Sequence, residues 1–403
     1  MRFFYADPGL RSYLGHHATS CKLITDELHR RRIDTRVLAF VKVEPRLQAE
    51  LGAVPHFRCP TYWHSDGDPI CGWLNAFHTG TQVTRADFDK LADIGAEDVV
   101  YVNSALPTQL MGTISWLAAL PPERQPQVVI EFGVDPGVHV RTDGAPILQL
   151  RPGEPGQNAV LFRFAVKRIT KSGLRPLHLA TFDASSSAAY GLLLEYPVAV
   201  LPVPRLATIP IARRSGKRPI TVGILGSQRP DKGYQHVPEI ARELLRSRRD
   251  VRLLIHNGDS GAMTEVQKSL GGLVAADNRV TLDQRQADPA LWNQLLSATD
   301  LVLCPYDEER FATSYSSVAS EAIANGIPLV VPARTSLARV MGDFGGAGAT
   351  FDRFTPASIA LATQAALDDF DRIGALAYAG AEKWKAENGP GPLVDAILDR
   401  ARS

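Results

Sequence analysis

The sequence predicts an α/β protein of two domains, each a parallel β-sheet with helices on both faces. The chain has 403 residues. That is more than one ordinary hydrophobic core serves, so two domains of roughly 200 residues are expected. Short apolar runs alternate with longer amphipathic stretches, as in repeated strand–helix units. The apolar runs are nearly continuous, which is typical of parallel strands covered on both faces.

The first half alternates less regularly than the second. An amphipathic helix is expected at Thr19–Arg32, with Cys21, Ile24 and Leu28 on one stripe. Between Phe57 and Gly80 the chain is rich in Trp, His, Pro and Gly, and we expect an irregular segment there. The strands expected in this half are Arg2–Tyr5, Thr35–Val41, Val99–Asn103, Val128–Phe132, Leu177–Phe182 and Val198–Leu201.

The second half alternates strands and helices clearly. Its expected strands are Ile220–Leu225, Val251–His256, Arg279–Leu282, Leu301–Cys304 and Leu329–Val331. Its expected helices are Pro238–Arg248, Met263–Leu270, Ala290–Ala298 and a short helix around Glu321. The tail, Pro356–Ser403, is expected to be helical with a break at Asn388–Pro392. Ligands in such sheets bind beyond the carboxyl ends of the strands, so the loops there are the place to look for a site.

The domain boundary is predicted near residue 205. The segment Pro202–Pro219 is basic, bears several prolines and has little periodicity, which indicates a linker. We therefore expect a first domain at 1–205, a linker at 206–219 and a second domain at 220–403. The last helices of the chain are candidates for packing back on the first domain.

Composition excludes several classes of partner and location. The net charge is +1, from 44 basic and 43 acidic residues, so no bulk attraction to nucleic acid is indicated. The four cysteines form no C-x-x-C pair, which fits a reducing cytoplasm. No apolar stretch is long enough to span a bilayer, and the first residues do not resemble a signal peptide.

The loop Gly226–Gly233 follows a buried strand and carries two cations three positions apart. Arg229 offers a planar fork and Lys232 a point charge, and together they suit a pyrophosphate. The glycine spacing of a Walker loop is missing. Taken alone, a solvated turn is the default interpretation of this loop.

The stretch Arg310–Pro332, R-F-A-T-S-Y-S-S-V-A-S-E-A-I-A-N-G-I-P-L-V-V-P, carries a second anion-binding signal. A polar loop leads into a short helix, and the backbone N–H groups at a helix N-terminus attract anions. Glu321 lies in this helix among small and apolar residues, so its carboxylate needs a partner. A glutamate on a solvated helix face is the alternative. The apolar surroundings favour a ligand.

These motifs in order resemble the nucleotide-sugar-binding domain of GT-B-fold glycosyltransferases, and most closely glycosyltransferase family 4. The motifs are G-S-Q-R-P-D-K-G after the first strand of the second half, H-N-G after the next, then A-T-D-L-V-L-C-P-Y and S-S-V-A-S-E-A-I-A-N-G. The resemblance implies two Rossmann-like domains facing each other across a cleft. It covers Ile220–Pro332 well and the first half only in outline.

The resemblance also implies roles for individual residues. Arg229 and Lys232 would neutralise the donor diphosphate and act in catalysis, and Glu321 would bind the ribose hydroxyls. The remaining candidates for donor binding are Gly15, Gly226, Asn257, Pro305, Tyr306, Thr313, Ser316, Ser317 and Val318. Members of the family commonly have a further glutamate, which meets the donor sugar, eight residues before the ribose-binding one. Here Thr313 occupies that position, so the contact to the sugar is unexplained.

The first half offers weaker candidates at its strand ends. Gly15 precedes the first long helix, where the family brings a glycine-rich loop near the donor phosphate. Glu131 ends a strand and is a candidate general base, although a structural salt bridge explains it equally well. His16, His17, Asn103 and Ser104 also lie at strand ends or turns. Asp183 is a candidate helix cap.

Neither the histidines nor the acidic residues predict a metal site. The ten histidines show no ligand spacing on a helix face. Asp66-Gly67-Asp68 has a D-x-D pattern, but it lies in a turn-rich loop and reads best as a turn. We therefore expect no metal and no cofactor beyond the donor, a UDP- or GDP-sugar.

Two basic clusters remain outside the predicted donor site. One comprises Arg30, Arg31, Arg32 and Arg36, and the other comprises Arg163, Lys167, Arg168, Lys171 and Arg175 beside Phe162 and Phe164. The second would suit a phosphorylated acceptor or an anionic membrane surface, and a solvated helix face is equally possible.

The combined prediction is a glycosyltransferase that moves a sugar from a nucleotide-diphosphate sugar to a glycan, lipid-linked or other acceptor. The resemblance implies metal-independent, retaining transfer. The cysteine pattern favours a cytoplasmic location, and the second basic cluster leaves peripheral membrane contact as an option. The alternatives are a GT-B nucleotide-sugar epimerase or phosphorylase, and a non-catalytic nucleotide-sugar-binding partner subunit.

Overall fold

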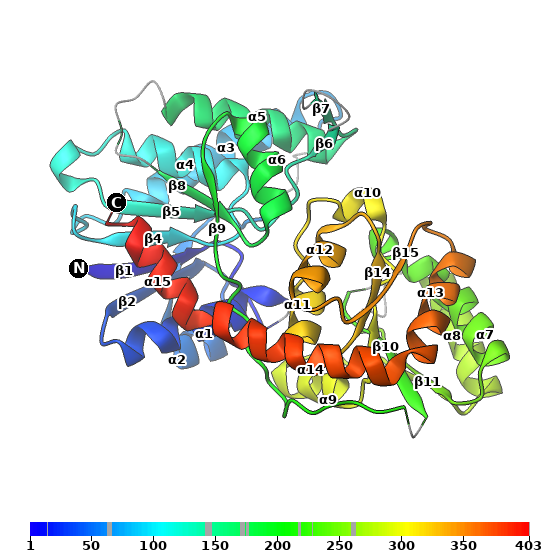
Figure 1. Cartoon of the computed structure of the whole chain (residues 1–403). Helices are drawn as coiled ribbons and strands as arrows, with labels where there is room; N and C mark the ends of the chain where they lie inside the picture. Colours follow the sequence, from blue (N-terminus) through cyan, green and yellow to red (C-terminus); the bar gives the residue numbers. More distant parts are fainter. Residues whose placement is uncertain are drawn as a thin grey trace. The chain divides into compact units, whose positions relative to one another are not determined.

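The computed structural model describes residues 1–13, 15–62, 67–141, 147–169, 174, 177–216, 219–227, 229–258 and 263–402. They form two compact units (Figure 1). Unit 1 comprises Met1–Pro204 and Pro390–Ser403, and unit 2 comprises Arg205–Gly389. Residues 206–219 thus count with unit 2, and the last helix counts with unit 1. Each unit is an α/β structure around a parallel sheet, which confirms the predicted class.

The main sheet of unit 1 has seven parallel strands in the order β3-β2-β1-β4-β5-β8-β9. Its strands are β1 (Arg2–Asp7), β2 (Asp34–Phe40), β3 (Ala53–Phe57), β4 (Val99–Val102), β5 (Gln127–Glu131), β8 (His178–Thr181) and β9 (Val198–Val200). A small antiparallel hairpin pairs β6 (Val138–Arg141) with β7 (Ile147–Leu150). The strand order reverses between β1 and β4, so the switch point, where ligands bind in such sheets, lies there.

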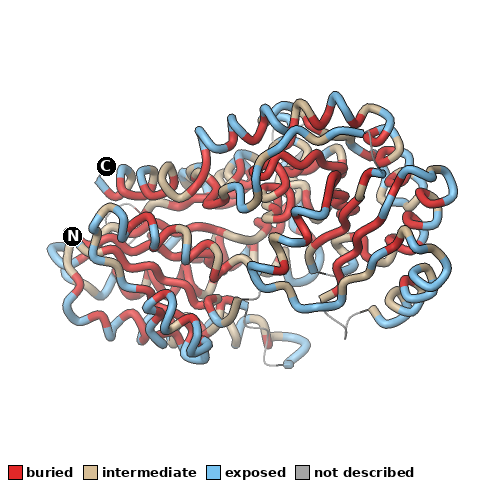
Figure 2. The backbone as a smooth tube through the Cα atoms, turned by 90° about the horizontal axis from the view of Figure 1, so that it is seen from below, coloured by how far each residue is buried: buried red, intermediate tan, exposed pale blue. Residues whose placement is uncertain are grey.

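Helices cover both faces of this sheet because successive side chains of a strand point to opposite faces. Phe4 and Ala6 of β1 pack in one core, and Phe3 and Tyr5 pack in the other. The first core includes residues of α3 (Gly72–Phe88), α4 (Pro107–Leu117), α5 (Glu154–Ile169) and α6 (Ala184–Leu194). The second includes residues of α1 (His16–Arg30), α2 (Pro45–Leu51) and α15 (Pro390–Arg400). Figure 2 shows the buried central strands in red.

Unit 2 contains a six-stranded parallel sheet in the order β12-β11-β10-β13-β14-β15. The strands are β10 (Ile220–Ile224), β11 (Val251–His256), β12 (Val280–Asp283), β13 (Leu301–Leu303), β14 (Leu329–Pro332) and β15 (Gly348–Phe351). The helices are α7 (Val237–Ser247), α8 (Thr264–Ala276), α9 (Pro289–Ser297), α10 (Glu308–Phe311), α11 (Ser317–Ala324), α12 (Ser336–Asp343), α13 (Pro356–Asp368) and α14 (Phe370–Glu387). The strand order reverses between β10 and β13, which places the switch point of this unit between those two strands.

The structure corrects the predicted irregular segment between Phe57 and Gly80. Helix α3 begins at Gly72, so the second part of that segment is helical. Its buried residues are Gly72, Gly80, Thr84, Asp87 and Phe88, so the covered face lacks the aliphatic stripe by which a helix is recognised. The break in the tail is also shorter than predicted, because α14 ends at Glu387 and α15 begins at Pro390.

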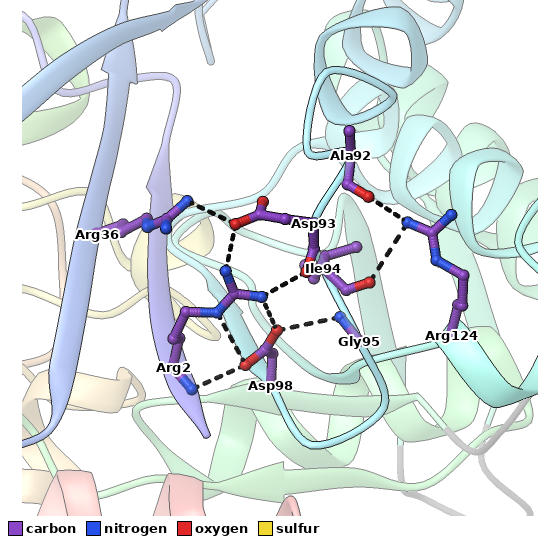
Figure 3. Close-up of polar contacts among 8 residues, drawn as sticks. All are labelled: Arg2, Arg36, Ala92, Asp93, Ile94, Gly95, Asp98 and Arg124. Carbon is purple, nitrogen blue, oxygen red and sulfur yellow. Dashed lines mark hydrogen bonds and ion pairs between the residues drawn. The ribbon is translucent and has the colours of Figure 1, made fainter.

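Strands β1 and β2 and the segment before β4 meet in a network of ion pairs (Figure 3). Arg2 opens β1 and pairs with Asp98, at 2.6 Å between Nη2 and Oδ2, and with Asp93. Arg36 of β2 lies 3.3 Å from the same Asp93. Asp98 also accepts the backbone N–H groups of Arg2 and Gly95. The network therefore holds the amino ends of the strands, opposite the edge at which ligands bind in such sheets.

Residues of both basic clusters form ion pairs with acidic side chains. Arg30 and Arg31 both pair with Glu27, and Arg31 also pairs with Asp395 of α15. In the second cluster, Arg163 pairs with Glu195, and Lys171 and Arg175 lie outside the described residues. Within the part of the chain that is described, no helix combines the length and the hydropathy needed to cross a membrane.

Candidate functional site

The loop after β10 brings its lysine against the end of β13. Pro230–Lys232 forms a 3₁₀ turn that ends at Gly233, whose backbone is left-handed with φ 67°. Lys232 Nζ lies 5.2 Å from the ring centroid of Tyr306, a cation–π contact. Gly226, Lys232, His256, Pro305 and Tyr306 line one recess of about 10 Å³, room for about one water. A nucleotide would therefore lie over this recess rather than inside it.

Lys232 is held in an environment that weakens its charge. Burial, together with nearby Arg229, lowers the pKa of Lys232 from 10.5 to about 8. A bound anion would reverse that effect, because an opposite charge favours the ammonium form. A bound anion would therefore stabilise the ammonium form of Lys232 at this position.

Arg229 is placed differently from Lys232. Its side chain is half-exposed and pairs with Asp231, at 2.9 Å between Nη2 and Oδ2. Arg310 of α10 approaches the same Asp231 oxygen at 3.9 Å. Two guanidinium groups therefore gather around one carboxylate beside Lys232. Arg310 was not among the predicted site residues, because the chain alone does not reveal that α10 returns to this loop.

The N-terminus of α11 lies next to the same loop. An added Cβ on Gly226 would meet Val318 Cγ2 at 3.2 Å and Lys232 Nζ at 3.8 Å, so the loop backbone passes directly over the helix start. Ser316 is the N-cap, and its Oγ accepts the backbone N–H of Ala319 at 3.4 Å. The first N–H groups of a helix, here at Ser317 and Val318, have no intrahelical acceptor and suit an anion.

Glu321 of α11 is largely covered, with 14% of its side chain exposed, and has partners that the motifs did not predict. Its Oε1 forms an ion pair with Arg205 at 3.1 Å, and its Oε2 accepts a hydrogen bond from Trp292 of α9. Burial raises the pKa of Glu321, while Arg205 and Trp292 act in the opposite direction. Arg205 opens unit 2, and no local pattern links it to a helix more than a hundred positions away.

Two further predicted donor residues lie at this edge. Asn257 follows β11 and is fully buried, and its Oδ1 and Nδ2 have no hydrogen-bond partner among the described residues. Buried polar atoms are nearly always satisfied, so this amide indicates a bound water or a ligand group. Thr313 is also buried, in the loop before α11.

In unit 1, Gly15 and Glu131 both lie at the carboxyl edge of the sheet. Gly15 is the N-cap of α1, with φ 84°, a conformation that favours glycine. Glu131 is fully buried at the end of β5, and its Oε2 accepts the backbone N–H of Ser104 at 2.8 Å. This bond fixes the turn after β4. Asp183 caps α6 by accepting the N–H groups of Ser185 and Ser186, which confirms that prediction.

Among the residues that the structure describes, no three His, Cys, Asp or Glu side chains gather in a way that would hold a metal ion. Asp66 of the D-x-D pattern lies outside the described residues. Asp68 accepts the backbone N–H groups of Ile70 and Cys71 before α3, which is the behaviour of a turn residue.

Comparison with known proteins gives a family match in the second half of the chain. The model of the family described as "Family 4 Glycosyltransferase in conflict systems" matches residues 192–363. No curated protein sequence matches the chain.

Solved structures match over nearly the whole length. The structure of Anabaena Alr3699/HepE in complex with UDP is 15% identical with a TM-score of 0.64, covering 99% of each chain. Sucrose-phosphate synthase from Thermosynechococcus elongatus is 13% identical with a TM-score of 0.64, covering 99% of this chain and 97% of that one. A glycosyltransferase from Rickettsia africae is 11% identical with a TM-score of 0.62, covering 100% and 98%. At these identities the likeness shows a shared fold.

Proposed function

We propose that this chain, which has the GT-B fold and matches a family 4 glycosyltransferase model over residues 192–363, transfers the sugar of a UDP-sugar to a hydroxyl group of an acceptor. We further propose that the transfer is metal-independent and retains the configuration of the sugar, as the family resemblance implies. Uridine is the proposed base because HepE, which shares the fold, has been solved with UDP and with UDP-glucose.

One observation carries the proposal: a lysine and a helix N-terminus meet at the switch point of unit 2. A Cβ added to Gly226 would lie 3.2 Å from Val318 Cγ2 and 3.8 Å from Lys232 Nζ, so both groups border the same loop position. Because glycine has no side chain, the loop backbone at Gly226 stays open to a phosphate that lies over the recess. A diphosphate at this point would receive the ammonium charge of Lys232 and the N–H groups of α11 together.

The same groups supply the chemistry of the transfer. When the anomeric C–O bond breaks, negative charge grows on the departing diphosphate, and preorganised cations stabilise that charge. Lys232 is already in place. Arg229 and Arg310 share Asp231 and would exchange part of that contact for the phosphate oxygens. This is the role that a bound metal plays in other transferases.

Glu321 is proposed to hold the ribose. Each carboxylate oxygen can accept more than one hydrogen bond, so its bonds with Arg205 and Trp292 leave capacity for two hydroxyl groups. Its largely covered position makes such hydrogen bonds stronger than they would be at an exposed position. Thr313, which replaces the glutamate common in the family, leaves the contact to the sugar open.

The proposal is tested first by binding. UDP at a hundred times its dissociation constant should add about 2.7 kcal/mol of stability, which a thermal shift detects readily. In the same assay, UDP should raise the unfolding temperature more than GDP or CDP does. If no nucleotide diphosphate shifts the unfolding temperature, both the donor assignment and the proposed activity fail.

Turnover then tests the role of the lysine. Lys232→Ala should lower the release of UDP from UDP-glucose by about 10²–10³-fold, the usual cost of one transition-state charge contact. The matched control is Lys268→Ala, an exposed lysine of α8 in the same unit that pairs with Glu265. Excess EDTA should leave the wild-type rate unchanged. Equal rates for Lys232→Ala and the control would refute the phosphate assignment.

Product analysis separates the proposed transfer from its alternatives. A nucleotide-sugar epimerase would change the sugar of the donor with no acceptor present, and a phosphorylase would need inorganic phosphate. A non-catalytic partner subunit would bind UDP-glucose without consuming it. The observation behind this alternative is Thr313, which replaces the glutamate that meets the donor sugar in the family. Retention is read from the anomeric coupling constant of the product by NMR.

A further inference from the structure

The indole of Trp292 lies between the Glu321 carboxylate and the recess that contains Lys232. Trp292 is in the first turn of α9, and its Nε1–H donates a hydrogen bond to Oε2 of Glu321 in α11. Its ring meets the imidazole of His256 edge to face, with 6.4 Å between the ring centroids. His256 lines the recess together with Lys232. One aromatic side chain of unit 2 thus connects the proposed ribose contact with the proposed phosphate contact.

The fold holds this indole in one orientation. Helix α9 begins at a firm cap, because Asp288 accepts the backbone N–H of the buried Leu291 at 2.8 Å. On the other side of the indole, Nε2 of His256 lies 3.0 Å from the carbonyl oxygen of Arg285. A carbonyl only accepts hydrogen bonds, so Nε2 carries the proton and the imidazole is fixed. Trp292 is therefore held by its helix and by a fixed neighbouring ring.

The two oxygens of Glu321 have different partners. Oε1 forms an ion pair with Arg205 at 3.1 Å, and Oε2 accepts the indole N–H of Trp292. A carboxylate has about four acceptor positions, two on each oxygen. One further hydrogen bond can therefore be accepted by each oxygen, and because both oxygens belong to one carboxylate, the two positions are neighbours.

Two neighbouring acceptor positions suit a pair of adjacent hydroxyl groups. The 2′- and 3′-hydroxyl groups of a ribose lie next to each other on the same side of the ring, so each can donate to its own oxygen. A deoxyribose has only one of them and would leave one oxygen of a largely covered carboxylate without that donor. A site built to accept a hydrogen bond from a hydroxyl group rejects a ligand that lacks the group.

We propose that Trp292 is a positioning residue which, together with Arg205, aims the two oxygens of Glu321 at both hydroxyl groups of the ribose. The donor is therefore the sugar ester of a ribonucleoside diphosphate, and 2′-deoxynucleotide sugars such as those of thymidine diphosphate are rejected. The inference rests on the proposed use of a UDP-sugar and names the part of the nucleotide that is recognised. In this role Trp292 acts through Glu321.

The first test is calorimetric titration of the full-length protein with UDP, 2′-deoxy-UDP and 3′-deoxy-UDP. For wild type, the Kd of each deoxy compound should exceed that of UDP by about 5–150-fold, the usual cost of a covered polar group that loses its partner. In Trp292→Phe, Oε2 is no longer aimed, so the penalty for one deoxy compound should fall by at least about fivefold. The penalty for the other should stay, because Arg205 still holds Oε1.

The matched control is Tyr378→Phe. It removes the polar group of a half-exposed aromatic side chain in α14 of the same unit. Both penalties and the Kd for UDP should remain those of wild type in this variant.

A second readout needs no ligand. The indole N–H resonance of Trp292 is identified by NMR from its absence in Trp292→Phe. Glu321→Gln should move that resonance upfield, because a neutral amide oxygen is a weaker acceptor than a carboxylate. The indole resonance of Trp116, in unit 1, should stay in place. An unmoved Trp292 resonance in Glu321→Gln would overturn the proposed positioning contact.

The outcomes separate this inference from the proposed function. A wild type that binds UDP and both deoxy compounds equally well would overturn the ribose contact and leave the diphosphate assignment intact. Equal weakening of all three ligands in Trp292→Phe would mean that the indole has only a structural role, which would overturn its assignment. A wild type that binds none of the three ligands would refute the donor assignment, and the ribose contact with it.

Discussion

At the scale of single residues, the candidate site depends on charges that the protein keeps in unfavourable surroundings. Lys232 sits in a recess at the end of β10, and its pKa falls to about 8. Glu321 lies largely covered in α11, and its pKa is raised by desolvation. Buried charges are costly unless a partner compensates them. Residues held in this way are frequent at functional sites, because a ligand supplies the missing compensation.

The lowered pKa of Lys232 predicts how UDP affinity varies with pH. Only the ammonium form attracts the diphosphate, so affinity should be constant below pH 7 and fall as pH rises through 8. Between pH 8 and 9 the Kd for UDP should increase about fivefold if the neutral lysine does not bind. Calorimetric titrations across this range measure the effect, and Lys232→Ala should show a flat profile. A flat wild-type profile would contradict the assignment.

The same pKa predicts the sign of the effect on stability without ligand. Between pH 8 and 10.5 the unfolded chain binds more protons at this lysine than the folded chain. The contribution of Lys232 to the free energy of unfolding therefore becomes more favourable as pH rises through that range. Stability without ligand and UDP affinity should thus respond to pH in opposite directions.

The pair of Arg205 and Glu321 predicts a strong energetic coupling. Their side chains are 3% and 14% exposed, and removing one partner leaves a buried charge alone. Glu321→Gln or Arg205→Met should each lower the free energy of unfolding by about 3–5 kcal/mol. The double variant should cost less than the sum of the two. Urea denaturation of all four proteins measures this cycle, and strict additivity would mean that the pair does not interact.

At the scale of elements, short loops at strand ends place the chemistry. Gly233 ends the 3₁₀ turn that carries Lys232, and an added Cβ would lie 1.8 Å from the carbonyl oxygen of Pro305. The loop after β10 and the chain after β13 can approach this closely only because no side chain separates them.

Gly233→Ala should therefore weaken UDP binding at least tenfold and destabilise unit 2 by more than about 1–2 kcal/mol, the cost of a left-handed backbone alone. Gly271→Ala is the control. It lies in α8 with nothing within 4 Å of an added Cβ. There, alanine should be neutral or stabilising by up to about 1 kcal/mol. UDP titration with denaturant unfolding measures both, and similar results for the two variants would contradict the packing argument.

At the scale of the whole molecule, the last helix of the chain belongs to the first unit. Leu393, Val394, Ile397 and Leu398 of α15 are buried in the core that includes Ile24 and Leu28 of α1. Arg31 adds contacts to Gly391 and Asp395. Unit 1 is therefore closed by a segment that the chain reaches only after completing unit 2.

Deleting residues 390–403 should unfold unit 1 and spare unit 2. The four buried side chains are each worth about 1.5–3 kcal/mol, together comparable with the whole stability of a domain. Hydrogen exchange should show loss of protection in β1–β5, with UDP-dependent protection kept in β10–β14. Asp399→Ala, at an exposed position of the same helix, is the control. Full protection of β1 after the deletion would show that unit 1 does not need α15.

The sequence predicted most of the strands because their signal is local. The predicted and observed bounds of β1, β10, β11 and β14 differ by at most two residues. Strand β15 was not predicted: its residues Gly348–Phe351 follow two glycines and are only partly buried, so no apolar run marks it. Helix α3 was not predicted for the same reason, because glycine, threonine and aspartate form most of its buried face.

Among the site residues, the motifs predicted the loop and helix that approach each other in unit 2. They did not predict that the Glu321 carboxylate forms an ion pair with Arg205 and accepts a hydrogen bond from Trp292. The roles of the predicted residues in binding and catalysis remain predictions that the variants above address.

The sequence by itself determined where most strands and helices lie along the chain and the α/β class, and its motifs carry the resemblance on which the proposed activity rests. Each of these rests on hydrophobic periodicity or on motifs read along a short piece of chain. Only the tertiary structure decided which charges meet. Asp7 and Asn103 are 96 positions apart, yet parallel strands end at one edge and bring them within 3.0 Å. Pairings of that kind depend on strand order, and strand order is settled by packing.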